Sequence, residues 1–328
     1  MPTARSPVPH SNSAPERGPA RVRPDNVEGG ILLVLGFACV IPFVEASAKA
    51  LGQAGVAAPQ ITWCRFAFQV VVIGALILAL NGGRIGPAPR PLWPFVLRGV
   101  LICLGSGLLY AGLAFLPMAD SSAIFFVEPL LLTFLSAMLL GERVGWRRWT
   151  AVGTGLVGAL LIVGPNMETA GWASLFPAGA AVSFAGAVLL TRAYAARASA
   201  LTFLFTTALT STLLLSLTLG IGWAAGIEAL TPRWTRAEDA WLLLAIGVLA
   251  TCTNLMLTQA FRIAPSSVLA PFLYLEIVGA TIAGIALFGE VPGMATVAGG
   301  LLVVGAGLVV WWRERGRSLP PPPVAHRK

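Results

Sequence analysis

The chain has 328 residues, of which 56% are hydrophobic and only 11% charged, and its mean hydropathy is +0.81. Soluble domains carry roughly 25% charged residues. A water-soluble fold of this length could not bury so much apolar surface. The composition therefore predicts an integral membrane protein whose solvent is the lipid bilayer.

The formal net charge of +8 does not by itself indicate a nucleic-acid-binding protein. The 22 lysines and arginines lie mainly in the two tails and in short gaps between apolar runs. This is how orientation signals are distributed in a membrane protein. We therefore expect no nucleic-acid partner.

The apolar body contains no histidine, the side chain that most often serves in acid–base catalysis and metal binding. Both histidines, His10 and His326, lie in the tails, and the four cysteines lie inside apolar runs without metal-ligand spacing. This pattern removes most hydrolase and metalloenzyme functions. We expect no metal and no cofactor.

One nucleotide-binding pattern occurs in a context that does not suit it. Gly153, Gly155 and Gly158 fit G-x-G-x-x-G, but they lie in an apolar helical run rather than after a strand. We interpret these glycines as sites of close helix packing. No P-loop pattern and no G-x-S-x-G pattern occurs, so an ATP-driven pump would need a partner chain.

In chain order, residues 1–28 form a polar tail rich in Pro, Ser and Arg that we expect to be disordered, and residues 313–328 form a second, basic and Pro-rich tail. Ten apolar runs lie between them, most of them long enough for the ~20 residues of a spanning helix. The fifth is short and is the least certain. The runs are Ile31–Lys49, Ile61–Leu80, Phe95–Leu116, Ser122–Leu140, Trp149–Val163, Trp172–Leu190, Leu201–Trp223, Ala240–Phe261, Val268–Phe288 and Ala295–Trp312.

The positive charges predict how these spans are oriented. If both termini are cytoplasmic, only Arg233 and Arg236 fall on the outer side, and Lys49 and Arg65 fall inside helices. The other 18 of the 22 basic residues then lie on the cytoplasmic side. Because cytoplasmic loops carry an excess of Lys and Arg, we expect a multi-pass protein of the bacterial inner membrane with both ends inside.

The chain contains an internal repeat with an offset of 148 residues. Eight of 44 positions are identical between 117–160 and 265–308. The matched pairs are Pro117/Pro265, Glu128/Glu276, Thr133/Thr281, Leu139/Leu287, Gly141/Gly289, Glu142/Glu290, Gly145/Gly293 and Leu160/Leu308. Because the copies are five spans apart, the second copy is inverted in the membrane, as in many secondary transporters.

The sequence resembles the drug/metabolite transporter superfamily in its EamA-type branch. The resembling segments are KALG at Lys49, Arg65-Phe66, the stretch Ala119–Trp149, Leu275-Glu276 and Gly289-Glu290. The resemblance implies an all-α protein of ten transmembrane helices that moves small organic solutes or metabolites by alternating access. We expect two five-helix repeats, at residues 29–165 and 166–312. After Gly289-Glu290 the second repeat continues Val-Pro-Gly, which departs from the family pattern and leaves the subfamily open.

Apart from Arg98, which we count with the cytoplasmic charges, five charged residues lie inside the runs, namely Glu45, Lys49, Arg65, Glu128 and Glu276. Each costs roughly 2.5–3.5 kcal/mol at the centre of a spanning helix, so such residues normally face a cavity or one another. Inverted symmetry places Glu128 and Glu276 near the middle of the bilayer. We interpret these two as lining the solute path or taking up protons, with a structural contact between helices as the alternative.

Glu45 and Lys49 share one helix face near the outer end of the first span, and Arg65 enters the second span from the same side. We expect them to converge with Glu128 in the outer half as a gate or substrate contact. The alternative for Lys49 and Arg65 is that they snorkel to the interface.

The neutral polar residues are weaker candidates. Trp63, Asn254, Gln259 and Tyr274 could line a cavity, although hydrogen bonding between helices is the commoner role of such residues. We assign Glu142 and Glu290 to loops or helix caps rather than to transport.

Together these features predict a secondary transporter of a small organic solute that works by rocking two inverted halves. The acidic residues inside the spans are compatible with coupling to protons. Two alternatives stay open: a membrane-embedded enzyme acting on a lipid-linked substrate, and a channel or receptor. The sequence leaves the substrate, the direction of transport, the coupling ion and the oligomeric state undetermined.

Overall fold

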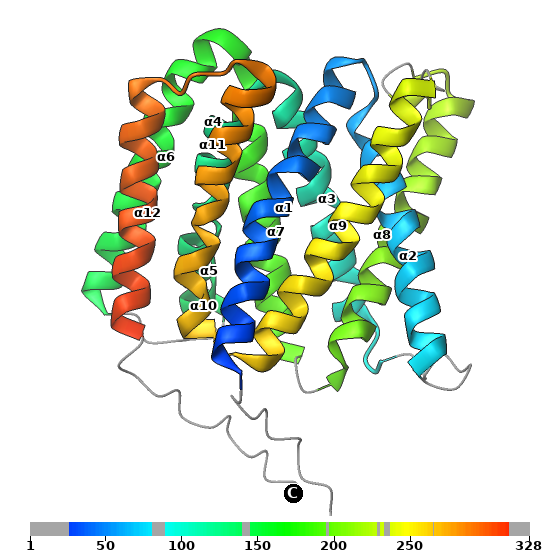
Figure 1. The fold of residues 1–328 in the computed structure, drawn as a ribbon, viewed down its shortest axis with the longest axis horizontal. Coiled ribbons are helices and arrows are strands. Elements are labelled where there is room, and N and C mark those ends of the chain that lie inside the picture. Colours follow the sequence, from blue (N-terminus) through cyan, green and yellow to red (C-terminus); the bar gives the residue numbers. More distant parts are fainter. Residues whose placement is uncertain are drawn as a thin grey trace, which may run out of the picture.

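The computed structural model describes residues 26–80, 89–139, 145–194, 197–227, 230–232, 237–264 and 266–314. Within these ranges the chain is helical and contains no strand. Most of each predicted tail lies outside the described residues. The chain is therefore an all-α polytopic membrane protein, as its sequence predicts (Figure 1).

Twelve α-helices and one short 3₁₀ helix make up the described part of the bundle. They are α1 (Val27–Gln53), α2 (Ala58–Leu80), α3 (Trp93–Phe115), α4 (Met118–Phe125), α5 (Glu128–Leu139), α6 (Trp146–Ala170), η1 (Gly171–Leu175), α7 (Phe176–Tyr194), α8 (Ala200–Ala224), α9 (Ala237–Ile263), α10 (Ser266–Leu273), α11 (Leu275–Phe288) and α12 (Met294–Glu314).

Local residues fix where these helices begin and end. The Asn26 side chain accepts a hydrogen bond of 2.7 Å from the Gly29 backbone N–H and so caps the first turn of α1. At a helix C-terminus, α11 ends before Gly289, which has a φ of 68°. Glycine adopts this left-handed conformation without the steric cost of a Cβ atom.

The membrane spans agree with the ten apolar runs of the sequence. Among the described residues, eight apolar helical stretches are long enough to cross a bilayer, and Met294–Val309 is a shorter ninth. One of the eight, Trp149–Tyr194, contains two separate helices, α6 and α7, joined by η1. Counting these two individually gives the predicted number.

The fifth span is longer than predicted. The apolar run ends at Val163, whereas α6 continues to Ala170 through Pro165 and Asn166. The Asn166 side chain donates a hydrogen bond of 2.9 Å to the Ile162 carbonyl and a second to Asp120. These bonds allow a polar residue to remain inside the helix, a possibility that an apolar-run criterion cannot detect.

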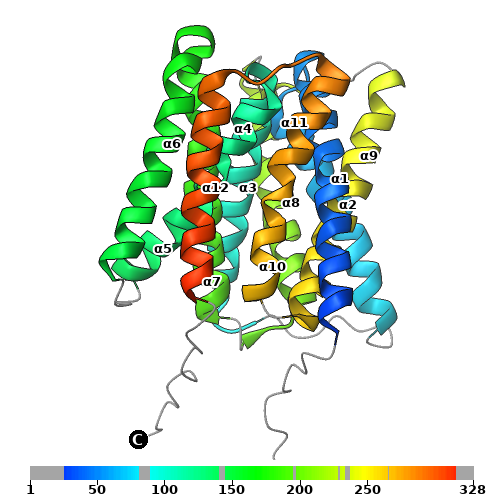
Figure 2. The same ribbon diagram turned by 60° about the vertical axis from the view of Figure 1, so that its left-hand side comes forward.

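The fourth and ninth spans are each broken, which the sequence analysis did not predict. The run Ser122–Leu140 consists of α4 and α5, and the run Val268–Phe288 consists of α10 and α11. Pro129 lies just after the first break and cannot donate a backbone hydrogen bond to the preceding turn. The two half-helices of each span are stacked end to end in Figures 1 and 2.

The 148-residue repeat is visible in the helices. Adding 148 to the bounds of α4 gives 266–273, the bounds of α10, so the breaks fall at equivalent positions. The same offset pairs α1 with α7, α2 with α8, α3 with α9, α5 with α11 and α6 with α12. In Figure 1 α1 begins, and α12 ends, at the lower end of the bundle. The five spans between equivalent helices therefore invert the second set.

Helix contacts across the two repeats are largely symmetric. The contact of α1 with α9 is matched by that of α7 with α3, α2–α9 by α8–α3, and α1–α11 by α7–α5. The pairs α2–α8 and α6–α12 are each their own equivalent. Two bundles follow from these contacts. The α1 bundle is defined as α1, α2, α9, α10 and α11, and the α7 bundle as α3, α4, α5, α7 and α8.

The distribution of polar residues is the reverse of that in a soluble protein. Large apolar side chains such as Leu32, Val71 and Leu301 are about two-thirds exposed. Charged Glu45 and Lys49, by contrast, are almost completely buried. Hydrocarbon is the expected environment of the outer surface.

Two of the three glycines in the G-x-G-x-x-G pattern lie in close packing, as expected. A Cβ atom on Gly158 would lie 2.7 Å from the Gly299 carbonyl of α12, and one on Gly155 would overlap the Leu130 side chain. A Cβ atom on Gly153 would meet nothing within 4 Å. The packing interpretation therefore holds for Gly155 and Gly158 and not for Gly153.

This difference provides a matched test of the α6–α12 contact. We expect Gly158→Ala to reduce the free energy of unfolding by about 1–3 kcal/mol, because the added methyl must push the two helices apart. Gly153→Ala should leave stability unchanged or raise it slightly. Thermal unfolding of the detergent-purified protein measures both. Equal melting temperatures for the two variants would contradict the contact.

Candidate functional site

The most polar contact between the bundles lies at the end opposite the first residue of α1, which we call the distal end. There the Lys49 ammonium is 2.6 Å from a carboxylate oxygen of Glu290, and the Lys49 side chain is 2% exposed. Lys49 also donates to the backbone carbonyl of Leu116, at the end of α3. Lys49 is thus buried in an ion pair and does not snorkel to the interface.

Glu290 connects three elements. It follows the end of α11, and its second carboxylate oxygen accepts a hydrogen bond of 2.9 Å from the Met118 backbone N–H, the first of α4. Its loop position agrees with the sequence analysis, but the ion pair with Lys49 was missed. The Gly-Glu pair that occurs in both repeats was the available signal, because an acidic residue present in both copies is expected to have a specific interaction partner. Glu142 lies outside the described residues.

Two contacts at the distal end have no symmetric counterpart. α1 packs against α3, and α4 packs against α11, each joining the α1 bundle to the α7 bundle. Close approach of Gly52 to Ala114, and of Met118 to Gly284, places these contacts beside Lys49 and Glu290. The equivalent pairs, α7–α9 and α10–α5, make no packing of comparable extent among the described helices. These two contacts close the bundles against each other at the distal end, whereas the symmetric α2–α8 contact also joins them elsewhere.

Three predicted glutamates lie together at the interface of the two bundles. Glu276 of α11 is within electrostatic range of both Glu45 and Glu128. Glu45 is 2% exposed and accepts one long hydrogen bond of 3.3 Å from the Ser122 hydroxyl of α4. Glu276 is 7% exposed and has no hydrogen-bond or ion-pair partner among the described residues. The structure thus brings together acids from α1, α5 and α11.

Two of these acids begin half-helices. Glu128 is the first residue of α5, and Glu276 is the second residue of α11. The positive end of a helix dipole stabilises a nearby negative charge by roughly 0.3–1 kcal/mol, which covers only part of the cost of burial. Arg192, in the last turn of α7, is within electrostatic range of Glu128. The cluster still carries more acids than adjacent cations.

Arg65 of α2 contacts the other bundle through α3. Its Nη1 donates a hydrogen bond of 2.8 Å to the Tyr110 hydroxyl and a longer one of 3.5 Å to Ser106, both on α3. Its buried Nε has no partner. Glu45 is also within electrostatic range of the Tyr110 hydroxyl, so Arg65 and Glu45 both lie near one tyrosine.

The neutral candidates mostly make contacts between helices. Trp63 donates to Ser216 of α8 at 2.8 Å, and Asn254 donates to Gln69 of α2 at 3.2 Å. Tyr274 packs on the Phe126 ring, 5.3 Å between centroids. These three positions match the helix-contact alternative.

Gln259 lies apart from the other neutral candidates. It is exposed near the end of α9 and accepts a hydrogen bond of 3.2 Å from Arg262 of the same helix.

Asp120 is a buried acid that the sequence analysis did not single out. It accepts hydrogen bonds from Asn166 of α6 at 2.7 Å and from Thr296 of α12 at 2.6 Å. Both carboxylate oxygens are therefore satisfied, which marks Asp120 as a structural link rather than as a free charge. The repeat gave no signal for it, since its equivalent is Val268.

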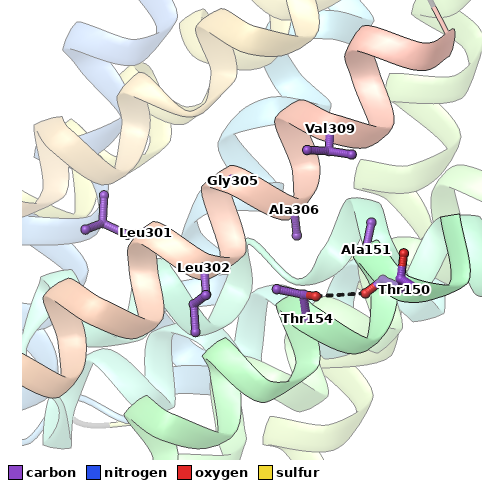
Figure 3. A pocket seen from close by; sticks show the side chains of 8 residues that line it. All are labelled: Thr150, Ala151, Thr154, Leu301, Leu302, Gly305, Ala306 and Val309. Carbon is purple, nitrogen blue, oxygen red and sulfur yellow. Dashed lines mark hydrogen bonds between the residues drawn. The ribbon is translucent and has the colours of Figure 1, made fainter. Parts of the chain in front are cut away.

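A hollow of about 240 Å³ lies between α6 and α12, and none of the predicted site residues lines it (Figure 3). It is lined by Thr150, Ala151, Thr154, Leu301, Leu302, Gly305, Ala306 and Val309. The Thr154 hydroxyl donates its proton to the Thr150 carbonyl, so this proton is not available to a bound solute. This apolar, outward-facing hollow suits hydrocarbon better than a polar solute.

Comparison with known proteins gives matches over most of the chain. Residues 28–164 and 171–312 each match the EamA-like transporter family. An S-adenosylmethionine uptake transporter of Rickettsia prowazekii is 26% identical over 78% of this chain and 83% of the relative. A riboflavin transporter of Rhizobium johnstonii is 31% identical over 70% and 73%. A pseudopaline exporter of Pseudomonas aeruginosa is 29% identical over 89% and 99%.

These relatives are small-solute transporters of bacteria and not enzymes. A solved crystal structure also shares the fold, with a TM-score of 0.57 and 18% identity over 87% of this chain and 97% of the other. At this identity the likeness concerns the fold alone.

The Lys49–Glu290 pair generates a test of stability. Glu290→Gln should lower the free energy of unfolding by up to about 3–5 kcal/mol, because it leaves a buried ammonium without its counter-charge. The double variant Lys49→Met/Glu290→Gln should recover part of this loss. Glu168→Gln, on the exposed face of α6, is the control. Denaturant unfolding in detergent measures the cycle, and a double variant that is no more stable than Glu290→Gln would refute the pair.

Proposed function

The chain belongs to the EamA-like transporter family and is a multi-pass membrane transporter of small solutes, and from this premise we propose that it works by alternating access between two bundles. In this proposal the α1 bundle and the α7 bundle rock about their shared α2–α8 and α6–α12 contacts. The described conformation is the one in which the distal end is closed.

The observation that carries the proposal is the unequal packing of equivalent helix pairs. In an inverted repeat, a second state arises when each half adopts the conformation of the other. The contacts α1–α3 and α4–α11 would then open, while α7–α9 and α10–α5 would form at the opposite end. Lys49 and Glu290 would separate in this step and become hydrated.

The moving units in this proposal differ from the two sequence repeats, residues 29–165 and 166–312. α1 packs most closely on α9 and α3 on α7, so each bundle mixes helices of both repeats. Rocking of one whole repeat against the other would break these mirrored contacts. We therefore propose that the rigid bodies are the α1 bundle and the α7 bundle, each of which contains helices of both repeats.

We further propose that both termini are cytoplasmic, so that the distal end faces outward and the described state opens inward. The distribution of Lys and Arg supports this orientation. Arg98, Arg192 and Arg262 all lie near the terminal ends of their helices, on the side where α1 begins. The same cycle serves uptake or export, and the relatives include both.

The interface residues supply a path for the solute. Glu45, Lys49, Arg65, Glu128 and Glu276 all lie where one bundle meets the other, and the bonds of Arg65, Glu45 and Lys49 cross that boundary. Charges buried between moving bodies are accessible to water from one side at a time. In this proposal Glu276 and Glu128 carry protons during the cycle, with Glu45, Tyr274 and Arg192 as the nearest titratable or charged groups.

A reversible cross-link tests alternating access without knowledge of the substrate class. A Cβ atom on Gly284 would lie 3.5 Å from that of Met118, within the range that disulfides span. In a background without the four native cysteines, Met118→Cys/Gly284→Cys should form a disulfide that holds the distal end closed. Uptake into proteoliposomes should fall to the level of protein-free liposomes and return on reduction.

Each single-cysteine variant is the control for this experiment, because it carries the same substitutions without the cross-link. Full uptake by the fully oxidised double variant would contradict alternating access at this end.

Proton coupling is tested with a pH gradient. Glu128→Gln and Glu276→Gln should each reduce gradient-driven uptake on the order of 10-fold or more, because an amide cannot carry the proton. Glu168→Gln on α6 should retain the response of the wild type. Unchanged stimulation by the gradient in both interface variants would remove these glutamates from the proton path.

A further inference from the structure

Arg65 is the one cation of the interface for which the described residues offer no carboxylate within ion-pair distance. Lys49 is matched by Glu290, whereas the bonds of Arg65 go to two hydroxyl groups, those of Tyr110 and Ser106. Arginine is rarely placed in a membrane interior without a partner. An arginine at such a position is therefore a candidate functional residue.

The geometry leaves one edge of the guanidinium unused. Both hydrogen bonds start from Nη1, while Nε is buried without a partner and Nη2 makes no bond to the described residues. A buried donor left unpaired is destabilising. Nε and Nη2 together form a fork that fits the two oxygens of a carboxylate. Tyr110 and the adjacent Phe66 ring, 5.3 Å from the guanidinium carbon, hold that fork in place.

Acidic groups lie near the same tyrosine. Glu276 is buried without a partner among the described residues, and Glu45, which has a single long hydrogen bond to Ser122, is within electrostatic range of the Tyr110 hydroxyl. A cationic group would neutralise these acids as a proton does. The interface thus offers a carboxylate-binding edge and incompletely compensated acids in the same region.

We infer that the transported solute is a zwitterion whose carboxylate binds the Nε–Nη2 edge of Arg65 and whose cationic group faces Glu45 and Glu276. This inference rests on the proposed function and adds the substrate class to it. The positions equivalent to Arg65 and Glu45 in the second repeat are Leu213 and Ala193, so the second repeat does not reproduce this pair of charges. In this inference, the helical framework is symmetric but the binding site within it is not.

The test uses matched probes that differ in a single group. S-adenosylmethionine carries a carboxylate and cationic groups, its decarboxylated form lacks only the carboxylate, and riboflavin is neutral. The twenty standard amino acids and amines corresponding to several of them extend the panel. Binding is read as thermal stabilisation of the full-length protein in detergent and transport as uptake into proteoliposomes.

The wild type should prefer a carboxylate-bearing member over its decarboxylated partner by about 10- to 150-fold, as expected for a hydrogen-bonded charge pair of ~1.5–3 kcal/mol. Arg65→Gln should bring this ratio close to one. Arg65→Lys should restore it only in part, because an ammonium lacks the fork. Arg262→Gln, at an exposed arginine of α9, should keep the ratio of the wild type.

Three results would overturn the inference: equal affinity of the wild type for both members of a pair, binding of riboflavin while every carboxylate-bearing member fails, or an unchanged ratio in Arg65→Gln. These failures are distinct from failure of alternating access. If the distal disulfide blocks uptake but the carboxylate makes no difference, the transport mechanism stands and the substrate class falls. If selectivity depends on Arg65 but the disulfide does not reduce uptake, the substrate class stands and alternating access at the distal end is refuted.

Discussion

The structure depends on one constraint: charges held inside a bilayer must be compensated by the protein, because hydrocarbon offers neither water nor counter-ions. The buried charges of the described residues fall into three groups with respect to this constraint. Lys49 and Glu290 compensate each other, and Asp120 is satisfied by two neutral donors. Arg65 and Glu276 are left incomplete. The first two solutions suit closure and folding, and the third suits a ligand or a proton that comes and goes.

The duplicated framework and the unduplicated charges have different roles. Helix bounds, span breaks and most helix contacts repeat with the 148-residue offset, and Glu128 and Glu276 repeat with them. Two interconvertible conformations need this symmetry. Arg65, Glu45 and Asp120 have apolar equivalents, so these charges are found in the first repeat alone, whereas the helical framework is common to both repeats.

Much of the fold could be predicted from the sequence because bilayer thickness sets the length of an apolar run, and the runs matched the helices closely except in the fifth span. The breaks within the fourth and ninth spans could not be predicted from the apolar runs, because the apolar sequence continues through Phe126 and Tyr274. Pro129 was the available signal for the first break. For the site, the glutamates were found from the cost of burying charge. Glu290 was missed because it follows a helix end, where an acid ordinarily needs no explanation, and its partner is 241 positions away in the chain. Long-range partners of this kind depend on tertiary packing, which local patterns do not encode.

The Lys49–Glu290 pair is well suited to a gate because a buried ion pair is specific without being strong. Desolvating two charges costs several kcal/mol per ion, and their attraction repays roughly that amount, so the net free energy of the pair is small. When the bundles separate, both groups recover their hydration and little is lost. A hydrophobic seal of the same area would resist opening, since each exposed Å² of apolar surface costs about 25 cal/mol. Removing one partner is different, because the remaining charge stays buried and unpaired in the closed state and destabilises that state selectively. In the proposed cycle, the charge pair would make closure of the distal end depend on correct alignment of α1, α3, α4 and the end of α11.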